Sequence, residues 1–172
     1  MEKPRFTLTL ADEGETSTLG IALADALQSI REAIESNGIV IGVAGDLGSG
    51  KTTLVRALLR RLGVAGSVKS PTFALLEPYE VSRLHLYHFD FYRFKNPREF
   101  RESGFQELFQ LGNICLVEWP ERAGEYLPAV DLNIRLSFLD FGRSADVRAN
   151  TEMGERCLEK LRTHPKPLRA DA

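Results

Sequence analysis

The residues with the clearest chemical meaning lie in a glycine-rich segment, residues 45–52, which reads GDLGSGKT and matches the pattern G-x-x-x-x-G-K-[ST] in full. Glycines let the backbone approach a ligand closely, and successive N–H groups in such a bend converge on phosphate oxygens at the positive end of the following helix. In this pattern Lys51 would hold the β- and γ-phosphates, and the hydroxyl of Thr52 would ligate Mg²⁺. The segment therefore predicts a cradle for a nucleoside triphosphate.

The sequence on either side supplies the elements that such a cradle needs. GIVIGVAG, residues 38–45, is a short apolar run rich in β-branched side chains, and it predicts a central strand buried on both faces. Residues 51–62 carry apolar side chains at helical spacing, and Gly63 ends that predicted helix. A structural glycine turn would explain the glycines but not the lysine and threonine that follow them. We expect the nucleotide to be bound by Gly45, Asp46, Leu47, Gly48, Ser49, Gly50, Lys51, Thr52 and Thr53.

Two acids at predicted strand ends could complete the site. Asp90 ends the strand HLYHFD, and Glu118 ends the strand ICLVE. Open α/β sheets place ligands at the carboxyl ends of their strands. Either acid could hold Mg²⁺ beside Thr52, directly or through water, while the other orients the attacking water. Each acid could also be a solvated residue at a strand end. We expect Lys51, Asp90 and Glu118 to be the catalytic residues, and Thr52, Glu118 and Asp90 to be the metal ligands.

A second loop could respond to the nucleotide. Ser70, Pro71 and Thr72 follow the predicted phosphate-loop helix and precede the next strand. In this topology the connection passes over the γ-phosphate, so its hydroxyls could fold onto metal and phosphate and be released after hydrolysis. An ordinary turn with capping hydroxyls explains the residues equally well.

Three further side chains have two interpretations each. Trp119 could stack on a base or a partner protein, or anchor the core. Arg93 could reach the phosphates as an arginine finger, although a structural role is favoured. His88 lies on the same strand face as Asp90 and could touch the switch loop, although a satisfied core or edge histidine is favoured.

Composition and charge exclude several classes of protein. With 172 residues, 43% hydrophobic and 27% charged, the chain predicts one globular domain over residues 1–162 and a flexible C-terminal tail over 163–172. A net charge of −2 provides no global basic field for nucleic acid. Two cysteines form neither a disulfide framework nor a zinc site. No apolar run of about 18 residues and no signal peptide is present, which predicts a cytoplasmic protein without a membrane contact.

Helical and strand patterns alternate along the chain. Strands are expected at residues 6–10, at 38–45, as a pair with its turn at 81–82, at 113–119, and as a final hairpin that turns at 140–144. Helices are expected at 21–36, at 51–62, from Asn96 onward with a break at Gly104, and at 152–162, while residues 11–18 read as a polar connection. This order predicts an α/β fold of the P-loop NTPase type, a three-layer sandwich around a mixed sheet with a parallel core and antiparallel edge strands.

Several segments together resemble one known family. GDLGSGKTT, VKSPTF, EPYE, YHFDFYR and LVEWPER follow one another in the order found in the bacterial TsaE (YjeE) family. The resemblance spans roughly residues 39–145, which is most of the predicted domain, and the combination of these motifs is specific to the family.

The resemblance implies a function and a set of partners. Members of this family are P-loop ATPases needed to make threonylcarbamoyladenosine in tRNA, and they act with TsaD and TsaB, whose transfer complex their ATP hydrolysis resets. It implies that residues 48–53 bind ATP, that Thr52 and Glu118 hold Mg²⁺, and that Asp90 is a metal-linked or catalytic acid. Gly142 and Arg143 match a Gly-Arg pair that lines the nucleotide pocket. The tRNA would be met at most indirectly, through the complex.

Two other functions share a phosphate loop. A small-molecule or nucleoside kinase usually closes an arginine-rich lid over the phosphates, and no long lid segment follows Gly104 here. A GTPase-like switch protein would carry the guanine-reading element N-K-x-D, which the sequence lacks. We therefore expect a slow, partner-dependent ATPase that uses ATP and Mg²⁺.

Overall fold

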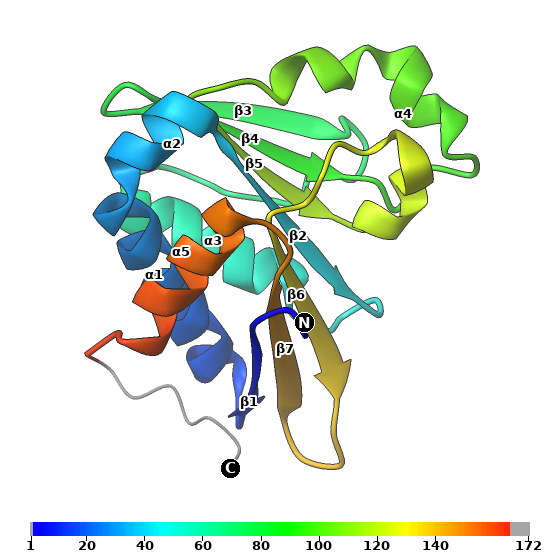
Figure 1. Ribbon diagram of the computed structural model, residues 1–172. Helices are drawn as coiled ribbons and strands as arrows, with labels where there is room; N and C mark the ends of the chain where they lie inside the picture. The colour runs from blue at the N-terminus through cyan, green and yellow to red at the C-terminus, as the bar shows by residue number, and fades with distance from the viewer. Residues whose placement is uncertain (1, 166–172) are drawn as a thin grey trace.

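The structure, a computed structural model, describes residues 2–165, and within them seven strands form one sheet in the order β1-β7-β6-β2-β5-β4-β3 (Figure 1). The part of the expected C-terminal tail beyond residue 165 lies outside the described residues. The strands are β1 (Arg5–Leu10), β2 (Ile39–Gly45), β3 (Leu76–Val81), β4 (Leu84–Asp90), β5 (Asn113–Glu118), β6 (Leu132–Phe138) and β7 (Arg143–Ala149). The helices are α1 (Glu13–Ser29), α2 (Arg31–Asn37), α3 (Lys51–Leu62), α4 (Arg98–Ser103) and α5 (Glu152–Arg162), with 3₁₀ helices η1 (Phe105–Leu108) and η2 (Pro120–Tyr126).

The sheet is mixed, as the order of elements predicts. The central strands β6, β2, β5 and β4 pair in parallel, whereas β3, β7 and β1 each pair antiparallel to a neighbour. Pro78 lies in β3, which forms one edge of the sheet. A proline cannot donate a ladder hydrogen bond, so an edge is where it is tolerated. The predicted parallel core with antiparallel edges is confirmed.

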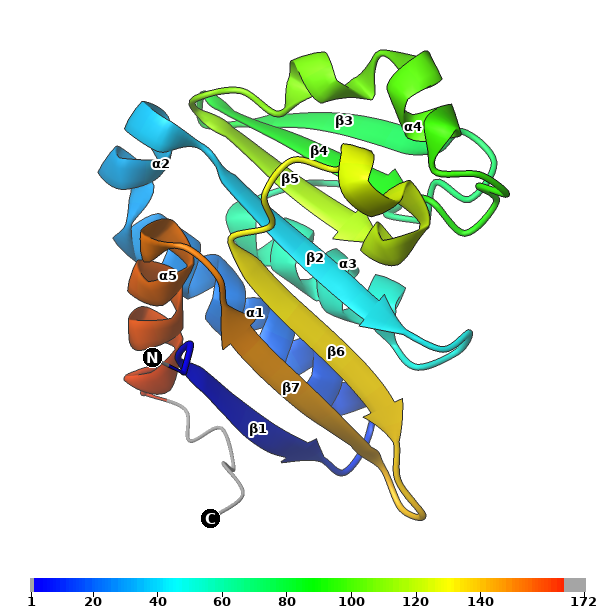
Figure 2. The ribbon, with the colours of Figure 1, turned by 45° about the vertical axis from the view of Figure 1, so that its right-hand side comes forward.

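The two faces of the sheet are covered differently. Helices α1, α2, α3 and α5 pack an aliphatic core against one face (Figure 2). On the other face, α4 and the two 3₁₀ helices bury an aromatic cluster that includes Phe89, Phe91 and Phe100. Figure 2 shows no helix in front of β1, β7 and β6 on that second face. The three layers are therefore complete only over the β3–β5 side of the sheet.

The first helix differs from its prediction. It begins at Glu13 rather than at residue 21, because Asp12 caps it: the Asp12 Oδ1 atom accepts the Glu15 N–H at 2.9 Å, and the Glu15 carboxylate accepts the Ala11 N–H at 2.7 Å. This pair is a variant of the capping box, in which the return hydrogen bond comes from Ala11, the residue before the N-cap. The expectation of a polar connection here was wrong, since the polar residues belong to exposed first turns. The predicted single helix to residue 36 is also divided at Ile30, whose φ of −113° leaves the helical region.

The remaining helices and strands lie close to where the sequence predicts them. Gly63 ends α3 in a left-handed conformation, and Gly104, also left-handed, ends α4 and leaves only a 3₁₀ turn beyond it. Both cysteines are buried and unpaired, and burial raises the pKa of each thiol to about 12, Asp131 contributing further at Cys157. Within residues 2–165, no helix combines the length and the apolar character that a membrane crossing requires.

Candidate nucleotide-binding site

The glycine-rich segment bends tightly between β2 and α3. Gly45, Gly48 and Gly50 all have positive φ angles, of 148°, 79° and 105°. At Gly45 a Cβ atom would lie 2.5 Å from the carbonyl oxygen of Leu136, a distance that no side chain tolerates. Gly45 is therefore required by both the backbone conformation and the close approach of β6, whereas Gly48 and Gly50 are favoured by the backbone conformation alone.

Lys51 lies inside this bend. Its ammonium group donates to the carbonyl oxygens of Gly45, at 2.7 Å, and Asp46, at 2.8 Å, and it lies 4.3 Å from the centre of the Trp119 ring. Burial lowers the pKa of Lys51 from its ordinary 10.5, while the negative charges of Glu118 and Asp90 partly offset that effect. Within residues 2–165, the lysine is thus a buried cation held by carbonyl oxygens and an aromatic ring rather than by a direct ion pair.

A pocket of about 350 Å³ opens beside the bend. It brings together seven of the residues expected to bind the nucleotide with both strand-end acids. The lining residues are Glu13, Leu47, Gly48, Gly50, Lys51, Thr52, Thr53, Asp90, Tyr92, Glu118, Trp119 and Arg143. The wall does not include Gly45, Asp46, Ser49 or Gly142, which belong to the surrounding backbone. It also does not include the loop of Ser70, Pro71 and Thr72, which lies behind Asp90 and contacts the Asp90 carboxylate through its two hydroxyls.

Glu118 contacts the start of the phosphate-loop helix. The hydroxyl of Thr52 donates to the Glu118 carboxylate, at 3.0 Å from Oε1 and 3.1 Å from Oε2. The Glu118 Oε1 atom also lies 2.8 Å from the His88 Nε2 atom. Glu118 and His88 are both buried. Of the two acids, Glu118 is the one in contact with Thr52.

Asp90 contacts the second loop instead. Its Oδ2 atom accepts the hydroxyl protons of Ser70 and of Thr72, the latter at 3.1 Å, and its Oδ1 atom accepts the Tyr92 N–H at 2.9 Å. The next loop residue, Phe73, is 83% exposed and lies under the Arg93 guanidinium, 3.9 Å from the ring centre. Arg93 therefore packs on the loop and does not line the pocket.

Arg143 enters the pocket from β7, and the turn before it explains how. A Cβ at Gly142 would lie 2.3 Å from the carbonyl oxygen of Leu10, so only glycine fits between β1 and the hairpin. The Arg143 Nη2 atom lies 3.4 Å from the Gly48 carbonyl oxygen. Its Nε atom is buried and finds no hydrogen-bond partner within residues 2–165. An unpaired buried donor beside a phosphate-loop segment suits an anionic ligand.

Three pocket residues were missed or left open by the sequence. Glu13 accepts a hydrogen bond from Thr53 at 3.3 Å, and its place at the start of α1 could have been found from the Asp12–Glu15 capping pattern. Tyr92 packs against Trp119 with ring centres 5.1 Å apart, and no local signal reveals it. Trp119 has a left-handed backbone, φ 58°, which turns the chain sharply after β5 and brings the indole to the pocket wall.

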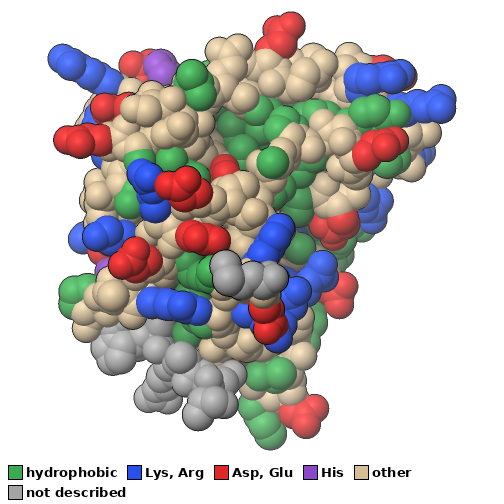
Figure 3. Space-filling view, viewed as in Figure 1, with side chains coloured by type: hydrophobic (Ala, Val, Ile, Leu, Met, Phe, Trp, Pro, Cys, Tyr) green, Lys and Arg blue, Asp and Glu red, His purple; other side chains and the backbone are tan. Residues whose placement is uncertain are grey.

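Exposed apolar side chains lie on the loops at the same end of the sheet as this pocket. Leu47 is 68% exposed in the bend, Phe73 lies on the second loop, and Phe141, 92% exposed, lies on the β6–β7 turn. Figure 3 shows hydrophobic side chains at the tip of that hairpin, at the bottom of the view. This end of the sheet thus carries a polar pocket and five exposed apolar side chains, here called the apolar rim: Leu47, Phe73, Phe138, Leu139 and Phe141.

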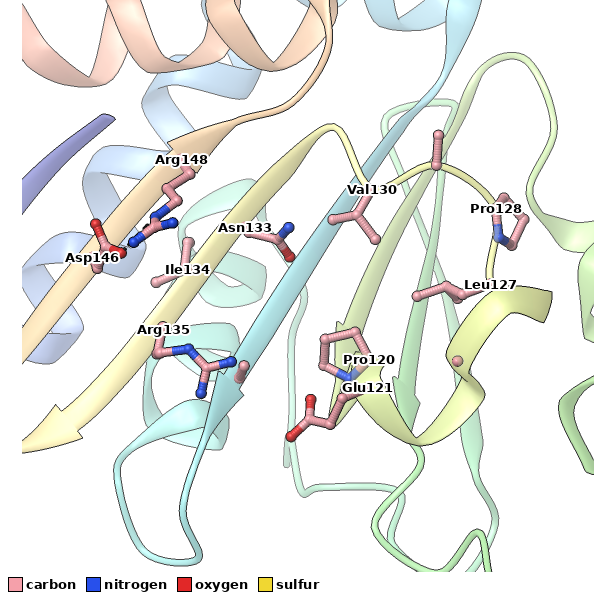
Figure 4. A pocket seen from close by; sticks show the side chains of 13 residues that line it. Pro120, Glu121, Leu127, Pro128, Val130, Asn133, Ile134, Arg135, Asp146 and Arg148 are labelled. Carbon is pink, nitrogen blue, oxygen red and sulfur yellow. Dashed lines mark hydrogen bonds and ion pairs between the residues drawn. The ribbon is translucent and has the colours of Figure 1, made fainter. Parts of the chain in front are cut away.

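A larger groove, of about 510 Å³, lies on the uncovered side of the sheet (Figure 4). Pro120 and Val130 form one wall, and Arg135 and Arg148 come from β6 and β7. Arg148 is paired with Asp146 at 2.7 Å. The groove contains none of the phosphate-loop residues, so its size does not make it the better candidate for the nucleotide.

The fold and the glycine-rich bend together define the class of the protein, an α/β protein of the P-loop type. Residues 10–144 match the family described as "Threonylcarbamoyl adenosine biosynthesis protein TsaE". This match covers more than half of the chain, and the chain therefore belongs to the TsaE family.

Individual relatives agree with this assignment. A protein of Haemophilus influenzae named tRNA threonylcarbamoyladenosine biosynthesis protein TsaE is 34% identical over 89% of this chain and 95% of its own. A protein of the same name from Rickettsia conorii is 39% identical over 77% of this chain and 71% of its own. The crystal structure of YdiB from Bacillus subtilis superposes with a TM-score of 0.74 at 28% identity, covering 94% of this chain and 96% of that one.

Proposed function

We propose that this chain binds ATP with Mg²⁺, hydrolyses it slowly, and thereby serves the synthesis of threonylcarbamoyladenosine in tRNA. The observation that carries the proposal is the contact of Thr52 with Glu118 beside Lys51, inside a pocket at the phosphate-loop bend. The biological role is supported by the relatives, which are named as biosynthesis proteins for this modified nucleoside.

The triphosphate would lie along the bend. The N–H groups at the start of α3 would supply donors to it at the positive end of that helix. Lys51 would exchange its contacts with the two carbonyl oxygens for the β- and γ-phosphates, and Thr53 would contact the α-phosphate. Arg143 offers its unpaired Nε donor to the same anion. These residues bind and orient the nucleotide before any bond is broken.

The oxygen ligands at the pocket fit Mg²⁺. A hydroxyl from Thr52 and carboxylates from Glu118 and Asp90 are the hard donors that this ion prefers. Among residues 2–165, no group of three or more His, Cys, Asp or Glu side chains could hold a metal ion by itself. That finding suits Mg²⁺, which takes its remaining ligands from phosphates and water. When bound, the ion neutralises the charge that develops on the phosphates.

Asp90 would orient the attacking water. Its carboxylate is occupied by the hydroxyls of Ser70 and Thr72. To reach a water at the γ-phosphate, Asp90 has to give up or share at least one of these contacts. The loop of Ser70, Pro71 and Thr72 would then change its position with the state of the nucleotide, as a switch loop does.

The partners would be TsaD and TsaB. The exposed side chains of the apolar rim support a protein contact at this end of the sheet, because exposed apolar residues gathered near a functional site commonly mark an interaction surface. A net charge of −2 does not favour direct binding of tRNA by this chain. A partner on the rim would sense the loop and the nucleotide together, so hydrolysis could reset the complex.

The test is an ATP-dependent pull-down with TsaB and TsaD, combined with phosphate release in the absence of any acceptor. The amount of wild-type chain retained by TsaB and TsaD should differ with and without ATP. Lys51→Ala and Glu118→Ala should be retained in the same amount under both conditions. Lys160→Ala, at an exposed residue of α5 outside the pocket, is the matched control and should behave like the wild type. Wild-type turnover by Lys51→Ala would refute the proposal, and transfer of the phosphate to a metabolite would indicate a kinase.

A further inference from the structure

A buried histidine lies directly behind the Glu118 carboxylate and has no part in the chemistry described so far. His88 is in β4, its side chain is 0% exposed, and its Nε2 atom lies 2.8 Å from Glu118 Oε1. Its other ring nitrogen, Nδ1, is buried and has no hydrogen-bond partner within the described residues. The imidazole is thus attached to its surroundings through one polar contact, the one to Glu118.

The chemistry of the pair assigns the proton. If Glu118 is ionised, its carboxylate can only accept hydrogen bonds, so His88 Nε2 is the donor in the 2.8 Å contact. In the neutral ring, Nδ1 is then the nitrogen without a proton. The bond is of the charge-assisted kind, which is stronger than a neutral one. It resembles the outer contacts that fix the orientation of metal-ligating side chains elsewhere.

The backbone holds the histidine rigidly. β4 lies between β3 and β5, and His88 is paired with Glu77 on one side and with Leu116 on the other. The contact to Glu118 also does not involve Thr52. It can therefore keep the carboxylate in place whatever the threonine hydroxyl binds.

An apolar side chain would be the simpler choice for this position. Burying a nitrogen without a partner lowers stability, and a leucine would avoid that loss. The single polar contact of His88 is made to a residue of the candidate site. We infer that His88 is a positioning residue, which orients the Glu118 carboxylate for the Mg²⁺–nucleotide complex; this inference rests on the proposed function.

The test compares variants that keep or remove the Nε2 donor. Glutamine places an amide N–H near the position of Nε2, asparagine places one near Nδ1, and leucine offers neither. His85 is exposed on the same strand, so His85→Leu is the matched control. Calorimetry with a non-hydrolysable ATP analogue at varied Mg²⁺, and again in EDTA, separates metal-dependent from metal-independent binding. Thermal unfolding is followed in parallel.

We expect His88→Leu and His88→Asn to raise the Mg²⁺ concentration for half-saturation about tenfold, the range known for such outer contacts. Affinity in EDTA should stay within about twofold, and His88→Gln should restore most of the Mg²⁺ dependence. Equal Mg²⁺ dependence in the wild type and His88→Asn would overturn the inference. The inference would also be overturned if His88→Gln and His88→Asn raised the Mg²⁺ concentration for half-saturation equally and in proportion to their loss of thermal stability. The comparison of His88→Gln with His88→Asn tests the inference even if His88→Leu does not fold.

A second measurement needs no nucleotide. The ¹⁵N chemical shifts of the His88 ring should show a proton on Nε2 and none on Nδ1, and Glu118→Gln should alter them. A proton on Nδ1 alone would overturn the inference while leaving ATP binding intact. A wild-type chain that binds no nucleotide at all would instead refute the proposed function, and the positioning role with it.

Discussion

Glu118 and Asp90 are neighbours at the carboxyl ends of adjacent parallel strands, where they form a register pair between β5 and β4. Both are buried, yet their partners belong to different kinds of structure. Glu118 contacts Thr52 in helix α3 and His88 in strand β4, which are regular elements of the core. Asp90 contacts Ser70 and Thr72, which belong to the irregular connection between α3 and β3.

This difference suggests a division of labour between two similar acids. A carboxylate held by a helix and a central strand cannot move without disturbing the core. One held by loop hydroxyls can exchange those partners at little cost, since loops sample alternative conformations more readily. Glu118 therefore suits a constant task such as metal binding, and Asp90 suits a task that changes during turnover.

The largest effect is expected for Glu118→Gln. Loss of the charge beside Thr52 should reduce ATP turnover by at least about 100-fold, as removal of a preorganised electrostatic contact commonly does. Nucleotide affinity in EDTA should change little. Steady-state phosphate release and calorimetry measure the two quantities. A variant that keeps near-normal turnover would assign the metal-binding role elsewhere.

Asp90→Asn should reduce turnover less, by about 10- to 100-fold, which is at or below the lower limit of the range for a general base. The amide has one acceptor oxygen, so the hydroxyls of Ser70 and Thr72 lose part of their anchorage. Trypsin should then cleave faster after the exposed Lys69 at the start of the loop. Glu118→Gln is the control and should leave that cleavage unchanged. Equal protection in both variants would contradict the division between the two acids.

A smaller effect is expected when the loop alone is changed. Ser70→Ala combined with Thr72→Val removes both hydroxyls and leaves Asp90 intact, so turnover should change less than about tenfold, because neither residue lines the pocket. Hydrogen exchange of residues 69–75 should become faster, while residues 51–62 remain protected. Unchanged exchange in the loop would show that the two hydroxyls do not hold it in place.

The smallest expected effect is a change in the pKa of Lys51 when either acid is replaced. Burial lowers the pKa of Lys51 below 10.5, and Glu118 raises it more than Asp90 does. Glu118→Gln should therefore lower this pKa further than Asp90→Asn, as followed by NMR titration of the lysine. With a folded-state pKa below the unfolded value, the unfolded chain binds more protons, so stability should rise with pH in the window just below 10.5. A larger fall of the Lys51 pKa in Asp90→Asn than in Glu118→Gln would contradict this prediction.

Local patterns in the sequence were sufficient for much of the architecture. The glycine-rich bend, the buried strand before it and the helix after it depend on residues a few positions apart, and all three lie where the pattern predicts them. The same is true of the proline at a sheet edge and of the final hairpin. The start of the first helix was misplaced because its capping residues are polar and were assigned to a connection.

By itself, the sequence determined that two acids end strands and that a lysine and a threonine close a glycine-rich bend. Only the tertiary structure decided which acid meets which partner. Thr52 and Glu118 are separated by 66 residues, and Arg143 reaches Gly48 across 95. Such contacts depend on strand order, register and sheet twist, which arise when distant segments pack together. No pattern within one segment encodes them, and for that reason the contact between His88 and Glu118 became visible only in the folded chain.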